Sequence, residues 1–100
     1  MRRILGYARA NRMETLEKEF AVLKKSGALY VYLELSSGLT PYEELEAFGE
    51  CISNLNAGDI LLIPSVDRLH RDYTIGMHML EVLEEMRVSV VFLNHIHSEL

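Results

Sequence analysis

The stretch DILLIPSVDRLHRD, from Asp59 to Asp72, decides the fold because it joins a fully apolar strand to a dense group of charges. Four consecutive apolar residues, Ile60 to Ile63, follow a Gly-Asp turn and predict a strand that is buried on both faces. Pro64 cannot donate a hydrogen bond to a sheet, so we expect the strand to end before it. A short apolar strand of this kind is typical of a parallel sheet.

Charged residues follow this strand at once, among them Asp67, Arg68 and Arg71. Two arginines three residues apart at the mouth of a buried strand can converge on one anion, because a guanidinium fork matches the geometry of a phosphate. Ligands of open α/β sheets collect at the carboxyl ends of the strands. The alternative is that Asp67 only pairs with one of the arginines on a solvated turn, since surface ion pairs are common and weak.

Length and composition narrow the class of protein. One hundred residues predict a single domain, 1–100, and almost half of them are apolar, as in ordinary globular proteins. The net charge of −5 argues against a free-standing nucleic-acid binder, although a local basic pocket remains compatible with it. A single cysteine, Cys51, allows no internal disulfide and suits a reducing cytoplasm. No stretch approaches about 20 apolar residues, so we expect no membrane span.

The periodicity of apolar residues predicts alternating strands and helices. We expect strands at residues 3–8, 28–35, 60–63 and 88–93, and helices at 13–26, 40–56 and 73–86. This order implies a three-layer α/β domain, with a mostly parallel central sheet and helices on both faces. Thr40, Pro41 and Glu43 form a capping-box pattern for the second helix. Asp72 or Thr74 can cap the third helix.

Several polar residues lie inside or beside these elements. Taken alone, Tyr7 in the first strand is predicted to be a core residue, and Arg9 is predicted to be a surface arginine. Glu34 in the second strand is interpreted as an exposed strand residue. Cys51 beside the apolar stripe of the second helix is expected to be a small buried side chain rather than a reactive thiol.

Two motifs, Tyr7-x-Arg9 and Asp67-Arg68-Leu69-x-Arg71, occur in this order at the ends of predicted strands. Together they resemble the signature of the serine recombinase catalytic domain of the resolvase/invertase family, and the resemblance spans residues 3–97. It implies a resolvase-like fold, site-specific DNA recombination, and arginines that hold the scissile phosphate. The catalytic positions implied are Arg9, Asp67, Arg68 and Arg71. The phosphate- and DNA-binding positions implied are Tyr7, Arg9, Arg68 and Arg71.

The chain departs from that family at the positions that do chemistry. Asn11 stands where the family has its nucleophilic serine, and an amide cannot form the phospho-enzyme ester. The arginine at the start of the second helix is replaced by Tyr42 or Glu43, and the lysine after the third strand by Pro64 and Ser65.

Acidic residues also stand at positions related to the family's active site. Glu14 and Glu19 take the place of glutamines at the first helix, and an acid there repels a phosphate backbone. Glu34 with Ser37-Gly38 is a counterpart of the family's acidic residue and Ser-Gly turn.

The sequence therefore predicts a recombinase-like domain without its nucleophile, catalytically inactive, with a residual arginine phosphate site or a role in regulation or assembly. The alternatives are a protein-interaction module on an α/β scaffold and a DNA strand-transfer enzyme that uses another nucleophile. We expect weak DNA binding, and homo-oligomers or association with another recombinase-like protein. We expect no cofactor and no metal site, since His95 and His97 have no third or fourth ligand. The family's dimerising helix and helix-turn-helix are not expected in this chain, which stops at Leu100.

Overall fold

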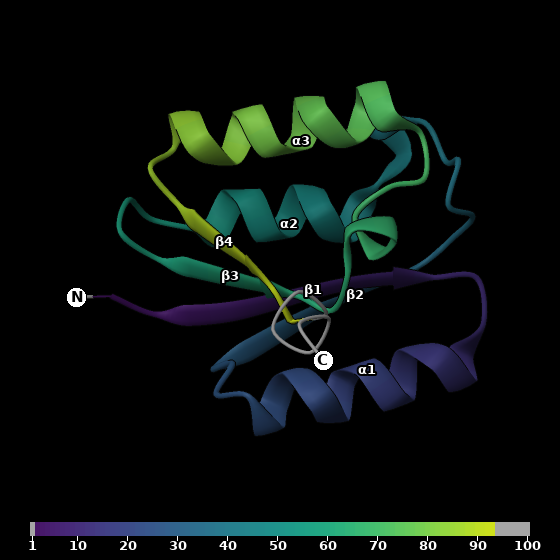
Figure 1. Ribbon diagram of the computed structural model, residues 1–100, viewed down its shortest axis with the longest axis horizontal. Coiled ribbons are helices and arrows are strands. Elements are labelled where there is room, and N and C mark those ends of the chain that lie inside the picture. The colour runs from purple at the N-terminus through teal and green to yellow at the C-terminus, as the bar shows by residue number, and fades with distance from the viewer. Residues whose placement is uncertain (1, 94–100) are drawn as a thin grey trace, which may run out of the picture.

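The computed structural model describes residues 2–93, in which strands and helices alternate along the chain (Figure 1). Two short 3₁₀ helices, Tyr42–Glu44 and Val66–Arg68, precede the second and third α-helices. The strands and α-helices are β1 (Ile4–Ala10), α1 (Met13–Lys25), β2 (Tyr30–Leu35), α2 (Glu46–Asn54), β3 (Ile60–Ile63), α3 (Tyr73–Glu85) and β4 (Ser89–Phe92).

The strands form one parallel sheet in the order β2-β1-β3-β4. The register places Leu5 of β1 beside Tyr30 of β2 and Leu61 of β3, and Leu61 beside Val90 of β4. Helix α1 covers one face of the sheet, and α2 and α3 cover the other (Figure 1). The predicted three-layer α/β fold with helices on both faces is confirmed.

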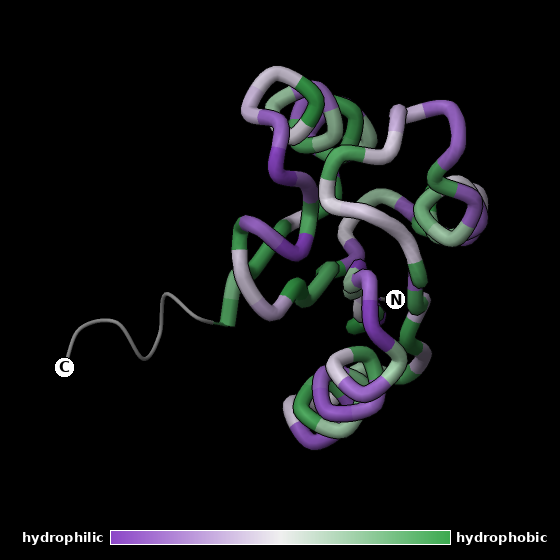
Figure 2. Tube along the Cα trace, turned by 90° about the vertical axis from the view of Figure 1, so that its right-hand side faces the viewer, coloured by the Kyte–Doolittle hydropathy of each residue, from purple (hydrophilic) through white to green (hydrophobic). Residues whose placement is uncertain are grey.

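The core is split in two by the sheet. Leu61 and Ile63 of β3 belong to the cluster on the α2 and α3 side, and Leu62 belongs to the cluster with Leu16 and Leu23 of α1. The prediction of a strand buried on both faces, ending before Pro64, is therefore confirmed. Figure 2 shows the same layering, with mostly hydrophobic strands between helices whose turns mix hydrophobic and hydrophilic residues.

The start of α2 differs from the prediction. The capping-box pattern at Thr40 to Glu43 forms only a 3₁₀ turn, and the Thr40 hydroxyl donates to the Ser37 carbonyl at 2.9 Å. The α-helix begins at Glu46, because the carboxylate that caps it comes from β2. Glu34 accepts hydrogen bonds from the backbone amides of Ala47, at 2.9 Å, and Phe48, at 3.0 Å.

Glu34 itself is buried, so its interpretation as an exposed strand residue is wrong. Its carboxylate also accepts a hydrogen bond from the Tyr7 hydroxyl at 2.9 Å. A negative charge at a helix N-terminus is stabilised by the helix dipole and by the free amides of the first turn. This contact therefore joins β1, β2 and α2 through one residue.

Other local predictions are confirmed. The Asp72 side chain caps α3 by accepting from the Ile75 amide at 3.2 Å. Cys51 is fully buried, and burial raises the pKa of its thiol to about 12. Within residues 2–93 no helix is long and apolar enough to cross a membrane. His95 and His97 lie outside the described residues.

Candidate functional site

The carboxyl ends of β1 and β3 lie side by side at the centre of the sheet. The chain leaves β1 toward β2 on one side and leaves β3 toward β4 on the other, so the crevice between these two ends is the topological switch point where α/β sheets bind ligands. A pocket of about 210 Å³ opens there. We call it the arginine pocket, and its lining residues are Arg9, Asn11, Gly38, Asp67, Arg68 and Arg71.

Arg9 is the buried wall of the arginine pocket. Its side chain donates from Nη1 to the Ser36 carbonyl at 3.0 Å and from Nη2 to the Asp67 carbonyl at 2.8 Å. Only 3% of the residue is exposed, so the interpretation of Arg9 as a surface arginine is wrong. Burial lowers the pKa of its guanidinium, and the nearby charges of Arg68 and Arg71 lower it further. All three arginines predicted for the site therefore lie near one another.

The Arg71 side chain packs against Gly38, and both residues line the arginine pocket. Its backbone amide donates to the Gly38 carbonyl at 2.9 Å. A Cβ atom on Gly38 would lie closer to the Cδ and Cγ atoms of Arg71 than real Cβ contacts allow. The sequence predicts the Ser37-Gly38 turn as a counterpart of a family turn, and the structure shows its physical role, which is to leave room for the Arg71 side chain.

His70 fixes the loop that carries Arg71, a role that sequence reasoning missed. The Nε2 atom of the buried imidazole lies 2.6 Å from the Thr40 carbonyl, and Nδ1 accepts from the Asp72 amide at 2.9 Å. Because a carbonyl only accepts and an amide N–H only donates, these two contacts require the neutral imidazole with its proton on Nε2. His70 thereby ties the loop after β2 to the start of α3.

Arg68 pairs with a residue of α1. Its Nε lies 2.9 Å from Oε2 of Glu19, while its Nη1 lies 3.9 Å from Oδ2 of Asp67. Asp67 accepts a closer hydrogen bond, from the Ser65 hydroxyl at 2.6 Å, and this bond lowers the pKa of the Asp67 carboxyl. The sequence leaves open the alternative that Asp67 only pairs with an arginine on a solvated turn. Asp67 does lie 3.9 Å from Arg68, but its hydrogen bond with Ser65 is the shorter contact.

Tyr7 does not reach the arginine pocket. Its side chain is fully buried, its hydroxyl donates to Glu34, and its ring meets the Phe48 ring edge-on with centroids 5.3 Å apart. Burial is the main reason that the pKa of this hydroxyl is raised, and the Glu34 carboxylate adds to it. The interpretation of Tyr7 as a core residue is confirmed, and its predicted phosphate binding stays a prediction for a residue that does not line the arginine pocket.

The residues predicted to stand in place of the family's other cations include Tyr42, Pro64 and Ser65. The Tyr42 ring packs edge-on against His78, with centroids 4.9 Å apart, and against Phe48 at 6.0 Å. Pro64 follows β3 directly, and the Ser65 side chain bonds Asp67. Asn11, predicted to stand at the position of the family's nucleophilic serine, lies on the wall of the arginine pocket and is exposed to solvent.

The chemistry of the arginine pocket favours an anion. Its lining is polar and holds three guanidinium groups against the single carboxylate of Asp67, and guanidinium forks match phosphate oxygens. In residues 2–93 no three His, Cys, Asp or Glu side chains are grouped so as to hold a metal ion. The arrangement is therefore chemically suited to a phosphate-sized anion, and its lining residues are arginines, an aspartate, an asparagine and a glycine.

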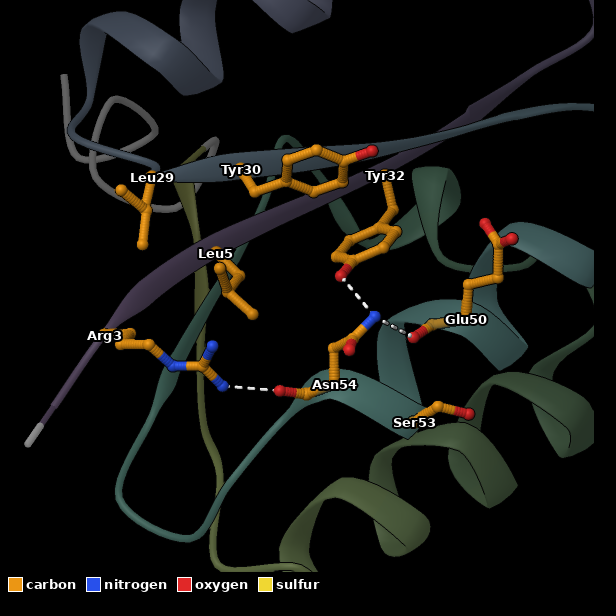
Figure 3. Close-up of a pocket in the computed structure, with 8 residues that line it drawn as sticks. All are labelled: Arg3, Leu5, Leu29, Tyr30, Tyr32, Glu50, Ser53 and Asn54. Carbon is orange, nitrogen blue, oxygen red and sulfur yellow. Dashed lines mark hydrogen bonds between the residues drawn. The ribbon is translucent and has the colours of Figure 1, made fainter.

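A larger hollow of about 480 Å³ lies away from the arginine pocket, between the start of β2 and the end of α2 (Figure 3). Several of its polar groups are hydrogen-bonded to one another. The Arg3 guanidinium donates to the Asn54 carbonyl at 2.5 Å, and the Asn54 side chain donates to the Tyr32 hydroxyl at 2.9 Å and to the Glu50 carbonyl at 3.1 Å. These bonds hold α2 against the sheet, so we interpret the hollow as structural.

Comparison with known proteins agrees with the fold. The sequence model of the family described as "Resolvase, N terminal domain" matches residues 5–99. The C-terminal catalytic domain of ISC1926 TnpA, an IS607-like serine recombinase, superposes with a TM-score of 0.70 at 24% identity, over 93% of this chain and 67% of that one. The first ORF in transposon ISC1904 from Sulfolobus solfataricus P2 superposes with a TM-score of 0.68 at 20% identity, over 91% of this chain and 66% of that one. At these identities the two structures show a shared fold, and the chain spans about two thirds of their length.

Proposed function

The chain belongs to the family of resolvase N-terminal domains, and from this premise we propose that it is a serine-recombinase-type domain that binds a phosphate of the DNA backbone without cutting it. The observation that carries the proposal is the arginine pocket, which Arg9, Arg68 and Arg71 line together with Asn11. The family is one of site-specific DNA recombination, so the phosphate that its arginines are expected to meet is a phosphodiester.

The absence of cutting follows from the chemistry of Asn11. Attack on phosphorus needs a group that can form a covalent ester, and a carboxamide cannot do so. Loss of the nucleophile alone removes a factor on the order of 10⁶ from the rate of a hydrolase studied in this way. The cationic groups expected from the family at Tyr42 or Glu43 and at Pro64 and Ser65 are also replaced, which removes stabilisation of charge in the transition state.

Weak binding follows from the charge of the whole chain. The net charge of −5 repels DNA at long range, so the attraction must come from the arginine pocket at short range. A domain that binds DNA weakly and does not cut it fits a regulatory role, in which residues 1–100 act as one unit beside an active recombinase or a second copy of the chain.

The proposal is tested by DNA binding at low salt. We expect the wild-type chain to bind a short duplex weakly, and a fourfold increase in salt to weaken binding about threefold for each phosphate contacted. The Arg68→Ala, Arg71→Ala double variant is expected to lose this binding. The matched control is Lys24→Ala, Lys25→Ala, which removes the same charge from the exposed end of α1 and is expected to keep most of it. Equal losses in both double variants would contradict a phosphate site in the arginine pocket.

The loss of cutting is tested by restoring the serine. We expect Asn11→Ser to form no covalent adduct with DNA on a denaturing gel, because the helix-start arginine and the lysine are still missing. A clear adduct would show that the remaining residues are sufficient for phosphoryl transfer. It would contradict the proposal that more than the nucleophile has been lost.

One observation favours a second candidate, an enzyme that uses a different nucleophile. The Ser65 hydroxyl donates to Asp67, and Asp67 lines the arginine pocket. The lowered pKa of Asp67 makes this carboxylate a weak base, so we rank this function below the first. Nicking of supercoiled plasmid that is lost in Ser65→Ala would establish it. A third outcome would indicate a protein-interaction module instead. In that outcome the chain forms a stable oligomer in solution, does not nick plasmid, and shows no DNA binding that depends on Arg68.

A further inference from the structure

The pairing of Arg68 with Glu19 connects α1 to the arginine pocket. Glu19 lies in the middle of α1, on the helix that covers the opposite face of the sheet from α2 and α3 (Figure 1). Its Oε2 accepts from Nε of Arg68 at 2.9 Å, and 17% of the Glu19 side chain and 29% of the Arg68 side chain are exposed. The pair is therefore partly shielded from water, where a charge acts more strongly on its neighbours than it would at the surface.

This pair is not built for stability alone. Among residues 2–93 the second carboxylate oxygen of Glu19, Oε1, is buried without a hydrogen-bond partner. A buried acceptor left without a donor is unfavourable, so the carboxylate is held at the arginine pocket without being fully satisfied there. Arg68 has five N–H donors, and Glu19 takes one of them, the Nε donor.

Glu19 also changes the charge of the arginine pocket. Arg9, Arg68 and Arg71 contribute three positive charges, and Asp67 and Glu19 contribute two negative charges, which leaves one positive charge. One positive charge is balanced by a phosphodiester, which carries one negative charge. Without Glu19 two positive charges would remain, which would match a phosphate monoester, because a monoester carries nearly two negative charges above its second pKa of about 6.

We infer that Glu19 is a specificity-determining residue, a built-in counter-ion of Arg68 that reduces the preference of the arginine pocket for doubly charged phosphate monoesters over singly charged phosphodiesters. This inference rests on the proposed function, since it concerns the anion that the same pocket binds. Its physical basis is that the Coulomb energy is proportional to the charge of the ligand. Removing the Glu19 charge therefore strengthens the binding of a dianion twice as much, in free energy, as that of a monoanion.

The test compares two probes that differ in one methyl group. Dimethyl phosphate is a monoanion and methyl phosphate is a dianion at pH 8, and both can be titrated while the Nε–Hε signals of the arginines are followed by NMR. We expect Glu19→Gln to bind dimethyl phosphate about threefold more tightly and methyl phosphate about tenfold more tightly than the wild-type chain does. Glu19→Ala, which also removes the hydrogen bond to Arg68, is expected to show the same order.

Glu17→Gln is the matched control. Glu17 is also on α1 and carries the same charge, but it is exposed and does not line the arginine pocket. We expect this variant to change both affinities by less than about 1.5-fold. The thermal midpoints of all variants show whether the fold is kept.

The outcomes separate this inference from the proposed function. If the wild-type chain binds either anion through Arg68 and Arg71, but Glu19→Gln changes both affinities equally or not at all, the role of Glu19 is refuted and the phosphate site stands. If neither the wild-type chain nor any Glu19 variant binds either anion through these arginines, the proposed function fails and this inference fails with it.

Discussion

The two ends of β1 each carry a partly or fully buried arginine, and they use it differently. Before the strand begins, Arg3 meets the buried carboxylate of Asp59, which accepts from the Arg3 amide at 3.1 Å, from its Nη2 at 2.7 Å and from the Asn56 amide at 2.8 Å. Near the end of the strand, Arg9 binds only backbone carbonyls and lies near two further arginines.

The difference between the ends lies in the balance of charge. The Nε atoms of both Arg3 and Arg9 are buried without a hydrogen-bond partner, so a missing hydrogen bond does not distinguish the two ends. At the Arg3 end a carboxylate neutralises the guanidinium, which is what a structural contact needs. At the Arg9 end positive charge is left over at the switch point of the sheet, which is what an anion site needs. Surplus charge therefore marks the end at which we propose the anion site, which we call the functional end.

The largest expected effect comes from breaking the ion pair between Arg3 and Asp59 at the neutral end of β1. Asp59→Asn removes a charge that three donors stabilise, and we expect the thermal midpoint to fall by roughly 5–10 °C. DNA binding should stay unchanged, because Asp59 lies at the opposite end of β1 from the arginine pocket. Thermal unfolding followed by circular dichroism, with a DNA titration of the same variant, measures both. An unchanged midpoint would contradict the structural role of this contact.

The same residue gives a pH dependence with a definite sign. The hydrogen bond from Arg3 is the main reason that the pKa of Asp59 is lowered in the folded chain. The stabilisation is therefore present above the unfolded pKa, about 4, and is lost as the pH falls through the lower folded pKa. We expect the midpoint of the wild-type chain to fall more steeply below about pH 4 than that of Asp59→Asn. Parallel curves would show that Asp59 is not linked to folding in this way.

The features that the sequence predicts correctly depend on local pattern. The buried strand, its end before Pro64, and the cap by Asp72 follow from apolar runs and from the chemistry of single residues, and the structure confirms them. The recombinase resemblance also brings together Arg9, Arg68 and Arg71, which are far apart along the chain. The order of strands that makes their meeting place a switch point could not be read from the sequence.

The wrong predictions involve contacts between distant segments. Arg9 and Glu34 are predicted to be exposed, because nothing near them in the sequence shows that carbonyls, amides and a tyrosine hydroxyl satisfy them after folding. The start of α2 is predicted too early for the same reason, since its cap comes from Glu34, which is 13 residues before Ala47. Glu19 is recognisable in the sequence as an acid related to the site, and only the structure pairs it with Arg68.

The third prediction disturbs the functional end without removing a charge. In Gly38→Ala the new methyl group collides with the Cγ and Cδ atoms of Arg71, so that side chain must leave its position. We expect DNA affinity at low salt to fall about tenfold, as when one charged hydrogen-bonded contact is lost. The thermal midpoint should change by less than about 5 °C, because the arginine can move out toward solvent.

Gly49→Ala is the control for Gly38→Ala. Gly49 lies in α2, and a methyl group added there would meet no atom within 4 Å, so alanine should raise stability slightly through its helix propensity. DNA affinity should not change. If both alanine variants bound DNA as the wild-type chain does, Arg71 would not take part in binding. The proposed anion site at the functional end would then consist of Arg9 and Arg68 alone.

The smallest expected effect comes from increasing the surplus positive charge of the arginine pocket. Asp67→Asn removes the one carboxylate that lines the arginine pocket, which should tighten DNA binding by about twofold at low salt. The gain is small because 64% of the Asp67 side chain is exposed, so water and salt screen its charge more than that of Glu19. Asparagine can still accept from the Ser65 hydroxyl, so the loop should keep its shape. Filter binding or fluorescence anisotropy against the wild-type chain measures the change. Weaker binding in this variant would mean that Asp67 acts by holding Arg68 in place rather than by reducing the positive charge. Binding at the functional end would then depend more on the positions of the arginines than on the balance of charge.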